Sequence, residues 1–333
     1  MKLFICFVVA YITPICLDAH HGTETYGLSA IGNNNRIQLI KKGELQLSLI
    51  SQYNSFLSLH QKDLNDIVDL KYASNLSLNV GFGLTENLSL FLSSPYAILS
   101  HKMNNEPQMT YNHFTDVLLG GMMTVFSNEL VGIQLIGGME LPVGNFKNNT
   151  LNTSVKWANS SNSVDPLLGG MFSYQKNSYS LLFQGSYLYS TSNSEGYKMG
   201  NASNVNLMFN KRFIKKCKEE MANKTNTCKC KSLIGKFNFG IGLNFFTSGK
   251  HRQSGSVVLN TGRSSIESQI GITYRVSEKI TIPVFINIPM KQKMQGIQNP
   301  LRYTISSGIQ FNIQTKKKSE IHSHGENEEP HQH

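Results

Sequence analysis

Histidines and cysteines of the kind that bind metal ions gather near both ends of the chain and in one hydrophilic segment between them. Neutral imidazole and thiolate are ligands that suit Zn²⁺, Cu and Ni. The candidate ligands are His20, His21, Cys217, Cys228, Cys230, His322, His324, His331 and His333. They predict weak, reversible metal binding without a fixed cofactor. The sharper hypothesis is a metal-capturing fringe that serves metal uptake or export.

A second interpretation of the same residues needs no metal. None of their spacings matches a standard zinc finger. In an oxidising compartment, two of the three cysteines between 214 and 233 would form a disulfide that pins this segment. The segment from 314 to 333 is short, charged and low in complexity, which is typical of a disordered tail. The sequence leaves both interpretations open.

Two acidic residues begin stretches that echo each other. The run Asp116-Val-Leu-Leu-Gly-Gly resembles Asp165-Pro-Leu-Leu-Gly-Gly, and each follows a long polar segment. Duplicated hairpins would explain the echo, and so would one local solution used twice. The carboxylates are either turn or strand-start residues or a pair of acidic groups at a pore mouth.

The sequence favours neither an enzyme nor a nucleic-acid-binding protein. A lipid-facing Ser–His–Asn phospholipase site needs His and Ser within hydrogen-bond reach at the outer rim. The non-tail histidines fall in segments that we expect to be loops: His60, His101, His113 and His251. The net charge of +10 comes largely from two hydrophilic patches, 211–231 and 316–318, and neither belongs to a nucleic-acid-binding motif.

These residues sit on a chain whose dominant pattern has period two. In the run from 236 to 245, Phe237, Phe239 and Ile241 share one parity, while Asn238 and Gly240 share the other. Alternate side chains of a strand point to opposite faces. The segments are about ten to fourteen residues long, as a tilted strand that crosses a bilayer requires. Backbone groups in lipid lack water, so such strands must close into a barrel.

The pattern predicts an all-β fold: one antiparallel transmembrane β-barrel of about twelve strands. The expected strands are 43–57, 70–83, 87–98, 115–126, 130–142, 165–175, 178–191, 202–213, 234–246, 264–276, 280–290 and 301–313. Tight turns alternate with long polar segments, which is the arrangement of short periplasmic turns and long extracellular loops in outer-membrane barrels. The exception is 214–233, a long insertion where a short turn is due.

The ends of the chain predict export. Lys2, an apolar run from 3 to 16 and a small residue at Ala19 read as a signal peptide over 1–19. A periplasmic segment, 20–42, would then lead into the barrel at 43–313. We expect insertion by the barrel-assembly machinery and contact with outer-membrane lipid. The oligomeric state is not predicted.

Charged residues on the polar parity are candidates for setting the selectivity of the barrel interior. Together with Asp116 and Asp165 they are Glu140, Glu267, Arg275 and Arg302. Phe91, Leu182 and Phe285 share that parity and would narrow the lumen. A narrow lumen leaves a plugged structural or adhesive barrel as an alternative to a channel.

The chain resembles the family of outer-membrane barrels labelled MetA-pathway of phenol degradation, from about residue 75 to 313. The resemblance is carried by the Asp-x-Leu-Leu-Gly-Gly strand starts, by Leu141-Pro142-Val143-Gly144 and by Gln184-Gly185-Ser186-Tyr187. It implies an outer-membrane channel for small, often aromatic or hydrophobic, solutes and transfers no catalytic residue. The cysteine insertion and the His-rich tail depart from the family pattern and put a phenol-type solute in doubt.

Overall fold

The computed structural model describes residues 40–57, 69–102, 109–143, 160–213, 237–259, 261–296 and 298–314. Within them, every regular element is a strand, and no described helix is long and apolar enough to span a membrane. The strands are β1 (Glu44–Phe56), β2 (Asp69–Gly83), β3 (Leu88–Lys102), β4 (Met109–Phe114), β5 (Val117–Ser127), β6 (Val131–Leu141), β7 (Asp165–Lys176), β8 (Tyr179–Leu188), β9 (Tyr197–Lys198), β10 (Ala202–Arg212), β11 (Phe237–Ser248), β12 (Arg252–Gln253), β13 (Ser256–Val257), β14 (Arg263–Arg275), β15 (Ile280–Met294) and β16 (Leu301–Gln314).

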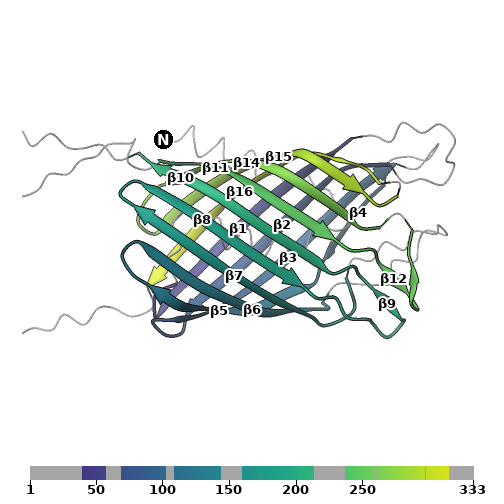
Figure 1. Cartoon of the computed structure of the whole chain (residues 1–333), viewed down its shortest axis with the longest axis horizontal. Coiled ribbons are helices and arrows are strands. Elements are labelled where there is room, and N and C mark those ends of the chain that lie inside the picture. The colour runs from purple at the N-terminus through teal and green to yellow at the C-terminus, as the bar shows by residue number, and fades with distance from the viewer. Residues whose placement is uncertain are drawn as a thin grey trace, which may run out of the picture.

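Twelve of these strands close into a ring. The order of hydrogen-bonded neighbours is β2-β1-β16-β15-β14-β11-β10-β8-β7-β6-β5-β3, and β3 pairs back with β2. All of these pairings are antiparallel, and Figure 1 shows the strands tilted around one barrel. The tight turns lie at one end, here called the short-turn end, which is also where the long connection between β10 and β11 begins and ends. The other long connections belong to the opposite end, here called the long-loop end. The predicted twelve-stranded antiparallel barrel is therefore confirmed.

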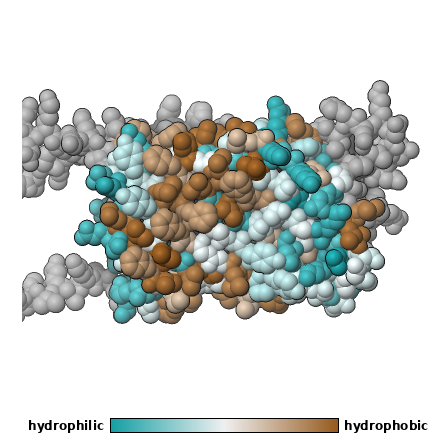
Figure 2. Space-filling model, in the orientation of Figure 1, coloured by the Kyte–Doolittle hydropathy of each residue, from teal (hydrophilic) through white to brown (hydrophobic). Residues whose placement is uncertain are grey.

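The outer wall is apolar and the inner wall is mostly polar, as the period-two pattern predicts. Leu78 is 48% exposed, whereas its chain neighbours Ser77 and Asn79 are 3% and 4% exposed. In the same way, Ile270 and Ile286 are exposed on the outer face, whereas their chain neighbours Gln269 and Phe285 are buried. Figure 2 shows apolar residues over much of the visible wall and mainly hydrophilic ones at the long-loop end. An apolar outer wall of this kind is stable in hydrocarbon rather than in water.

The strand ends depart from the prediction at the long-loop end. The segment 99–114, predicted as a loop, contains the end of β3 and all of β4, so His101 and His113 lie in strands. Strand β15 extends to Met294, and the predicted loops 192–201 and 247–263 contain β9, β12 and β13. Beyond the lipid both faces of a strand can be polar, which removes the alternation that a sequence pattern detects.

The predicted signal, 1–19, and insertion, 214–233, lie outside the described residues, as do nearly all of the tail and most of the segment 20–42.

One seam of the wall is weaker than the others. Pairing between β15 and β16 skips Ile282 and Pro283 and ends at Asn287 with Thr304, although β15 continues past Pro289 to Met294. Proline has no N–H to donate to a neighbouring strand. Beyond that point the Gln292 amide takes over: its oxygen accepts from the Leu301 N–H at 2.8 Å, and its nitrogen donates to the Leu301 carbonyl at 2.6 Å. A side chain thus joins the strands where the backbone ladder stops.

Candidate functional site: the barrel interior

One part of the interior is lined by amides and hydroxyls. Asn75 and Asn79 on β2 and Ser89 on β3 point inward and are buried. Among the described residues, neither amide atom of Asn75 or Asn79 has a hydrogen-bond partner, and the Ser89 hydroxyl has none either. Other inward groups do pair with each other: the Asn206 amide on β10 donates to Gln269 Oε1 on β14, past the one strand between them, at 3.0 Å. The lining is therefore polar and only partly satisfied by the protein itself.

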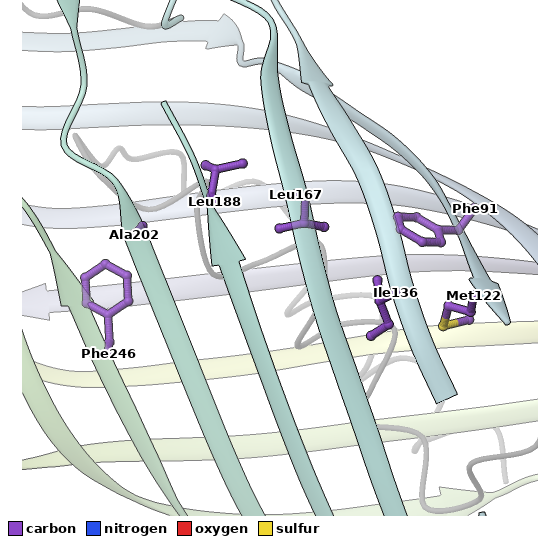
Figure 3. Close-up of a cluster of buried hydrophobic side chains, with 7 residues drawn as sticks. All are labelled: Phe91, Met122, Ile136, Leu167, Leu188, Ala202 and Phe246. Atoms are coloured by element: carbon purple, nitrogen blue, oxygen red, sulfur yellow. The ribbon is translucent and has the colours of Figure 1, made fainter. Parts of the chain in front are cut away.

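Another part of the interior is a continuous apolar surface, which we call the apolar belt. It takes one inward side chain from each of the neighbouring strands β3, β5, β6, β7, β8, β10 and β11. Figure 3 shows these side chains. The members are Phe91, Met122, Ile136, Leu167, Leu188, Ala202 and Phe246. The Phe91 ring lies over Gly120 on β5, where a Cβ would meet the ring. The inward position predicted for Phe91 is confirmed.

A second apolar cluster narrows the barrel. Met171, Leu182 and Met208, from β7, β8 and β10, pack with Phe285 from β15. The Phe285 ring extends over Gly271 on the adjacent strand β14, where any Cβ would collide with it. The inward positions predicted for Leu182 and Phe285 are confirmed. An aromatic ring and a glycine on the next strand together shape this constriction.

The two aspartates of the sequence echo tie down the long-loop end. The Asp116 carboxylate accepts hydrogen bonds from the Ser160 hydroxyl and from Ser161, whose N–H and hydroxyl lie at 2.6 and 2.8 Å. It stands where β4 passes into β5 and the register against β3 shifts by one residue. Such a bulge re-aims a side chain. Asp116 therefore holds a serine-rich loop segment, 160–163, against the inner wall.

Asp165 likewise forms hydrogen bonds that hold loop residues against the inner wall, here from the connection that follows β8. Its Oδ1 accepts from the Ser163 hydroxyl at 2.9 Å and from Thr191, whose N–H and hydroxyl lie at 2.8 and 3.2 Å. Its Oδ2 is buried and has no hydrogen-bond partner within the described ranges. Glu140 lies directly opposite Asp165 in the β6–β7 register and is also buried. The strand-start interpretation thus accounts for Asp116 and Asp165, and a role in selectivity stays a prediction.

The other predicted interior charges are spread along the barrel. Glu267 is buried and accepts a hydrogen bond from the Ser265 hydroxyl at 2.8 Å. Arg275 lies at the short-turn end in a small pocket that Arg212 also lines. Arg302 is exposed at the long-loop end, with its guanidinium 6.0 Å from the Tyr303 ring centre. The structure does not bring these three residues together, and their role in selectivity stays a prediction.

The described residues contain no group of three or more His, Cys, Asp and Glu side chains that could hold a metal ion. The ligands predicted from the sequence, at 20–21, 217–230 and 322–333, lie outside the described part of the chain. His251 is described and buried: it hydrogen-bonds with the Tyr197 hydroxyl and meets that ring edge-on at 5.6 Å. This pair joins the two connections that carry β9 and β12.

Arg263 is an interior residue that the sequence analysis missed, because the predicted strand began one residue later. It is the first residue of β14 and shares the inward parity of Ser265 and Glu267. Its guanidinium carbon lies 5.0 Å from the ring centre of Phe246 in the apolar belt. Its Nε is buried without a hydrogen-bond partner. Extending the period-two pattern by one residue would have identified it.

Comparison with solved structures places this architecture among known barrels. The chain is similar to an outer membrane channel from Pseudomonas putida F1, with a TM-score of 0.62, 10% sequence identity and coverage of 84% of this chain and 98% of that one. It shares the fold of outer-membrane β-barrels. The NanC porin matches at a TM-score of 0.43 and 10% identity, over 80% of this chain and 98% of that one. The CymD monoaromatic hydrocarbon channel matches at 0.38 and 8%, over 82% and 89%.

Comparisons with protein-family models and with curated proteins give no match. The resemblance to the phenol-degradation family therefore stays a prediction. Since the structural likeness establishes the fold alone, function has to be argued from the interior of this barrel.

Proposed function

We propose that this chain is an outer-membrane channel through which small solutes diffuse down their concentration gradient. The observation that supports it most directly is the inner wall at Asn75 and Asn79, whose buried amides find no hydrogen-bond partner in the part of the chain that the structure describes. A buried amide without a partner is costly, and it is stable where water or a solute supplies the hydrogen bonds. A barrel plugged for a structural or adhesive role would be expected to pair these groups within the protein.

The interior lining is polar in one part and apolar in another, and it therefore favours small amphiphilic organic solutes, including aromatic ones. Unpaired amides on β2 meet the polar part of such a solute, and the apolar belt meets its hydrocarbon part. The constriction around Phe285 and Met208 favours a narrow passage over a wide aqueous pore. Solute size should therefore limit passage strongly.

Single-channel recording in planar lipid bilayers tests the proposal. The purified mature chain should produce discrete open steps of small conductance. Proteoliposomes should swell in a small neutral solute and fail to swell in a trisaccharide. Silent bilayers, from protein that migrates as a folded barrel, would favour the plugged structural alternative. Hydrolysis of phospholipid in detergent micelles would favour a phospholipase instead.

A further inference from the structure

Arg263 carries a charge at the inner wall of the long-loop end. Its guanidinium lies over the Phe246 ring, and its Nε is buried with no hydrogen-bond partner among the residues that the structure describes. It forms no ion pair with the described residues. Arginine is enriched where a protein recognises a carboxylate, because its planar fork donates two parallel hydrogen bonds to the two oxygens. A partly desolvated arginine without a protein anion is thus prepared to meet an anion from outside.

The apolar belt begins at the same place. Phe246 is its last member, and Ala202 and Leu188 on the next two strands continue it. Figure 3 shows these side chains along adjoining strands, with Phe246 at one side of the group and Phe91 at the other. A molecule whose charged end reaches Arg263 would lay its body along this apolar surface and bury it.

Acidic groups occupy the other side of the same end. Strand β5, which Asp116 precedes, and strand β14, which Arg263 begins, are separated by five strands in either direction around the ring: β6, β7, β8, β10 and β11 one way, and β3, β2, β1, β16 and β15 the other. Glu140 and Asp165 lie inward on the two strands that follow β5. Glu267 lies deeper on the inward face of β14, on the same strand as Arg263. At the rim of the long-loop end itself, these acidic groups stand on the side away from Arg263, which would orient a solute that carries one negative charge.

We propose that Arg263, Phe246 and the adjoining apolar belt form a binding site for a small organic anion that has one carboxylate and an aromatic or apolar body. The proposal rests on the channel function and adds the chemical class of the solute. The carboxylate accepts hydrogen bonds from the terminal nitrogens of the guanidinium, while the guanidinium face stays on the Phe246 ring. The body of the anion lies on the belt.

Benzoate is the probe, and block of the ion current through the full mature chain in planar bilayers is the measurement. Benzoate should reduce the current at lower concentration than acetate, which lacks the ring, or benzyl alcohol, which lacks the charge. Arg263→Gln should raise the half-blocking concentration of benzoate about tenfold or more, because the charge-assisted pair is lost. Phe246→Leu keeps an apolar side chain and should raise it several-fold. Arg263→Lys keeps the charge and should rescue block only in part.

Arg252→Gln is the matched control, since Arg252 is exposed on β12 at the same end and the substitution removes the same charge. This variant should leave block by benzoate unchanged. Equal block of wild type and Arg263→Gln, or equal block by acetate and benzoate, would overturn the binding site. If wild type is electrically silent, the channel proposal fails. Calorimetric titration of benzoate in detergent then decides the site separately: binding lost in Arg263→Gln supports it, and absent or unchanged binding overturns it.

Discussion

The Asp116 carboxylate, at the start of β5, accepts hydrogen bonds from both the main-chain N–H and the hydroxyl of Ser161, which lies 45 residues further along the chain. Asp165 repeats this arrangement with Ser163 and Thr191. Each aspartate follows a long connection and ties loop residues to the inner wall. The echo between the two sequence runs therefore reflects one way of fixing loops where a strand begins.

Asp116→Asn should loosen this attachment without unfolding the barrel. Hydrogen bonds to a charged acceptor contribute about 1.5–3 kcal/mol, and a neutral amide supplies a weaker acceptor. Amide hydrogen exchange of residues 160–163 should accelerate about tenfold or more, while exchange in β10 and β11 stays unchanged. Ser163→Ala, which removes one hydroxyl donor from Asp165, should have a smaller effect. Unaltered protection of residues 160–163 in Asp116→Asn would show that other contacts hold the loop.

Gly271→Ala should disturb the constriction because the Phe285 ring occupies the space of the new methyl group. Overpacking of this kind typically costs about 1–3 kcal/mol. The displaced ring should also lower single-channel conductance. Phe285→Leu should restore most of the stability of Gly271→Ala, because the two sites are in contact. Strictly additive effects in the double variant, measured by urea unfolding in lipid vesicles, would contradict this packing.

The ring of strands could be predicted from the sequence because lipid imposes one rule on every wall residue. Leu78 and Asn79 must differ in polarity, since one faces hydrocarbon and the other the interior. That rule ends at the membrane boundary, so β4 and the small strands β9, β12 and β13 left no alternation to detect. The partners of Asp116 and Asp165 also could not be predicted, because they depend on how loops distant in sequence fold back. Arg263 was missed by one residue at such a boundary.

Zinc binding by the His- and Cys-containing segments stays a prediction of the sequence. The mature chain should bind Zn²⁺ weakly and reversibly in equilibrium dialysis at pH 7.5. Removal of residues 315–333 should lower the number of bound ions, because His322, His324, His331 and His333 leave together. Neutral imidazole is the ligand form, so lowering the pH to about 5 should release the metal. An unchanged stoichiometry after truncation would remove the tail from the proposal.

Ile270→Lys should destabilise the folded barrel because Ile270 lies on the outer face in the middle of β14 and is exposed there. A lysine on the lipid face near the bilayer midplane costs about 2–4 kcal/mol, and the cost falls to about 0–1 kcal/mol near the interface. Val276→Lys, just past the end of the same strand, is the matched control. The free energy of unfolding in lipid vesicles should separate the two variants. Equal values would place the bilayer elsewhere on the wall.

Gln292→Ala should weaken the seam between β15 and β16. The Gln292 amide satisfies both the N–H and the carbonyl of Leu301 at a point where the backbone ladder has ended. Truncation leaves two wall groups unpaired, and each unmet group costs about 1–3 kcal/mol when buried. Lys293→Ala, at the next, exposed residue, should cost far less. Urea unfolding in lipid vesicles gives the free energy of unfolding of both variants. If Gln292→Ala is as stable as Lys293→Ala, water reaches Leu301. This end of the seam would then lie outside the lipid.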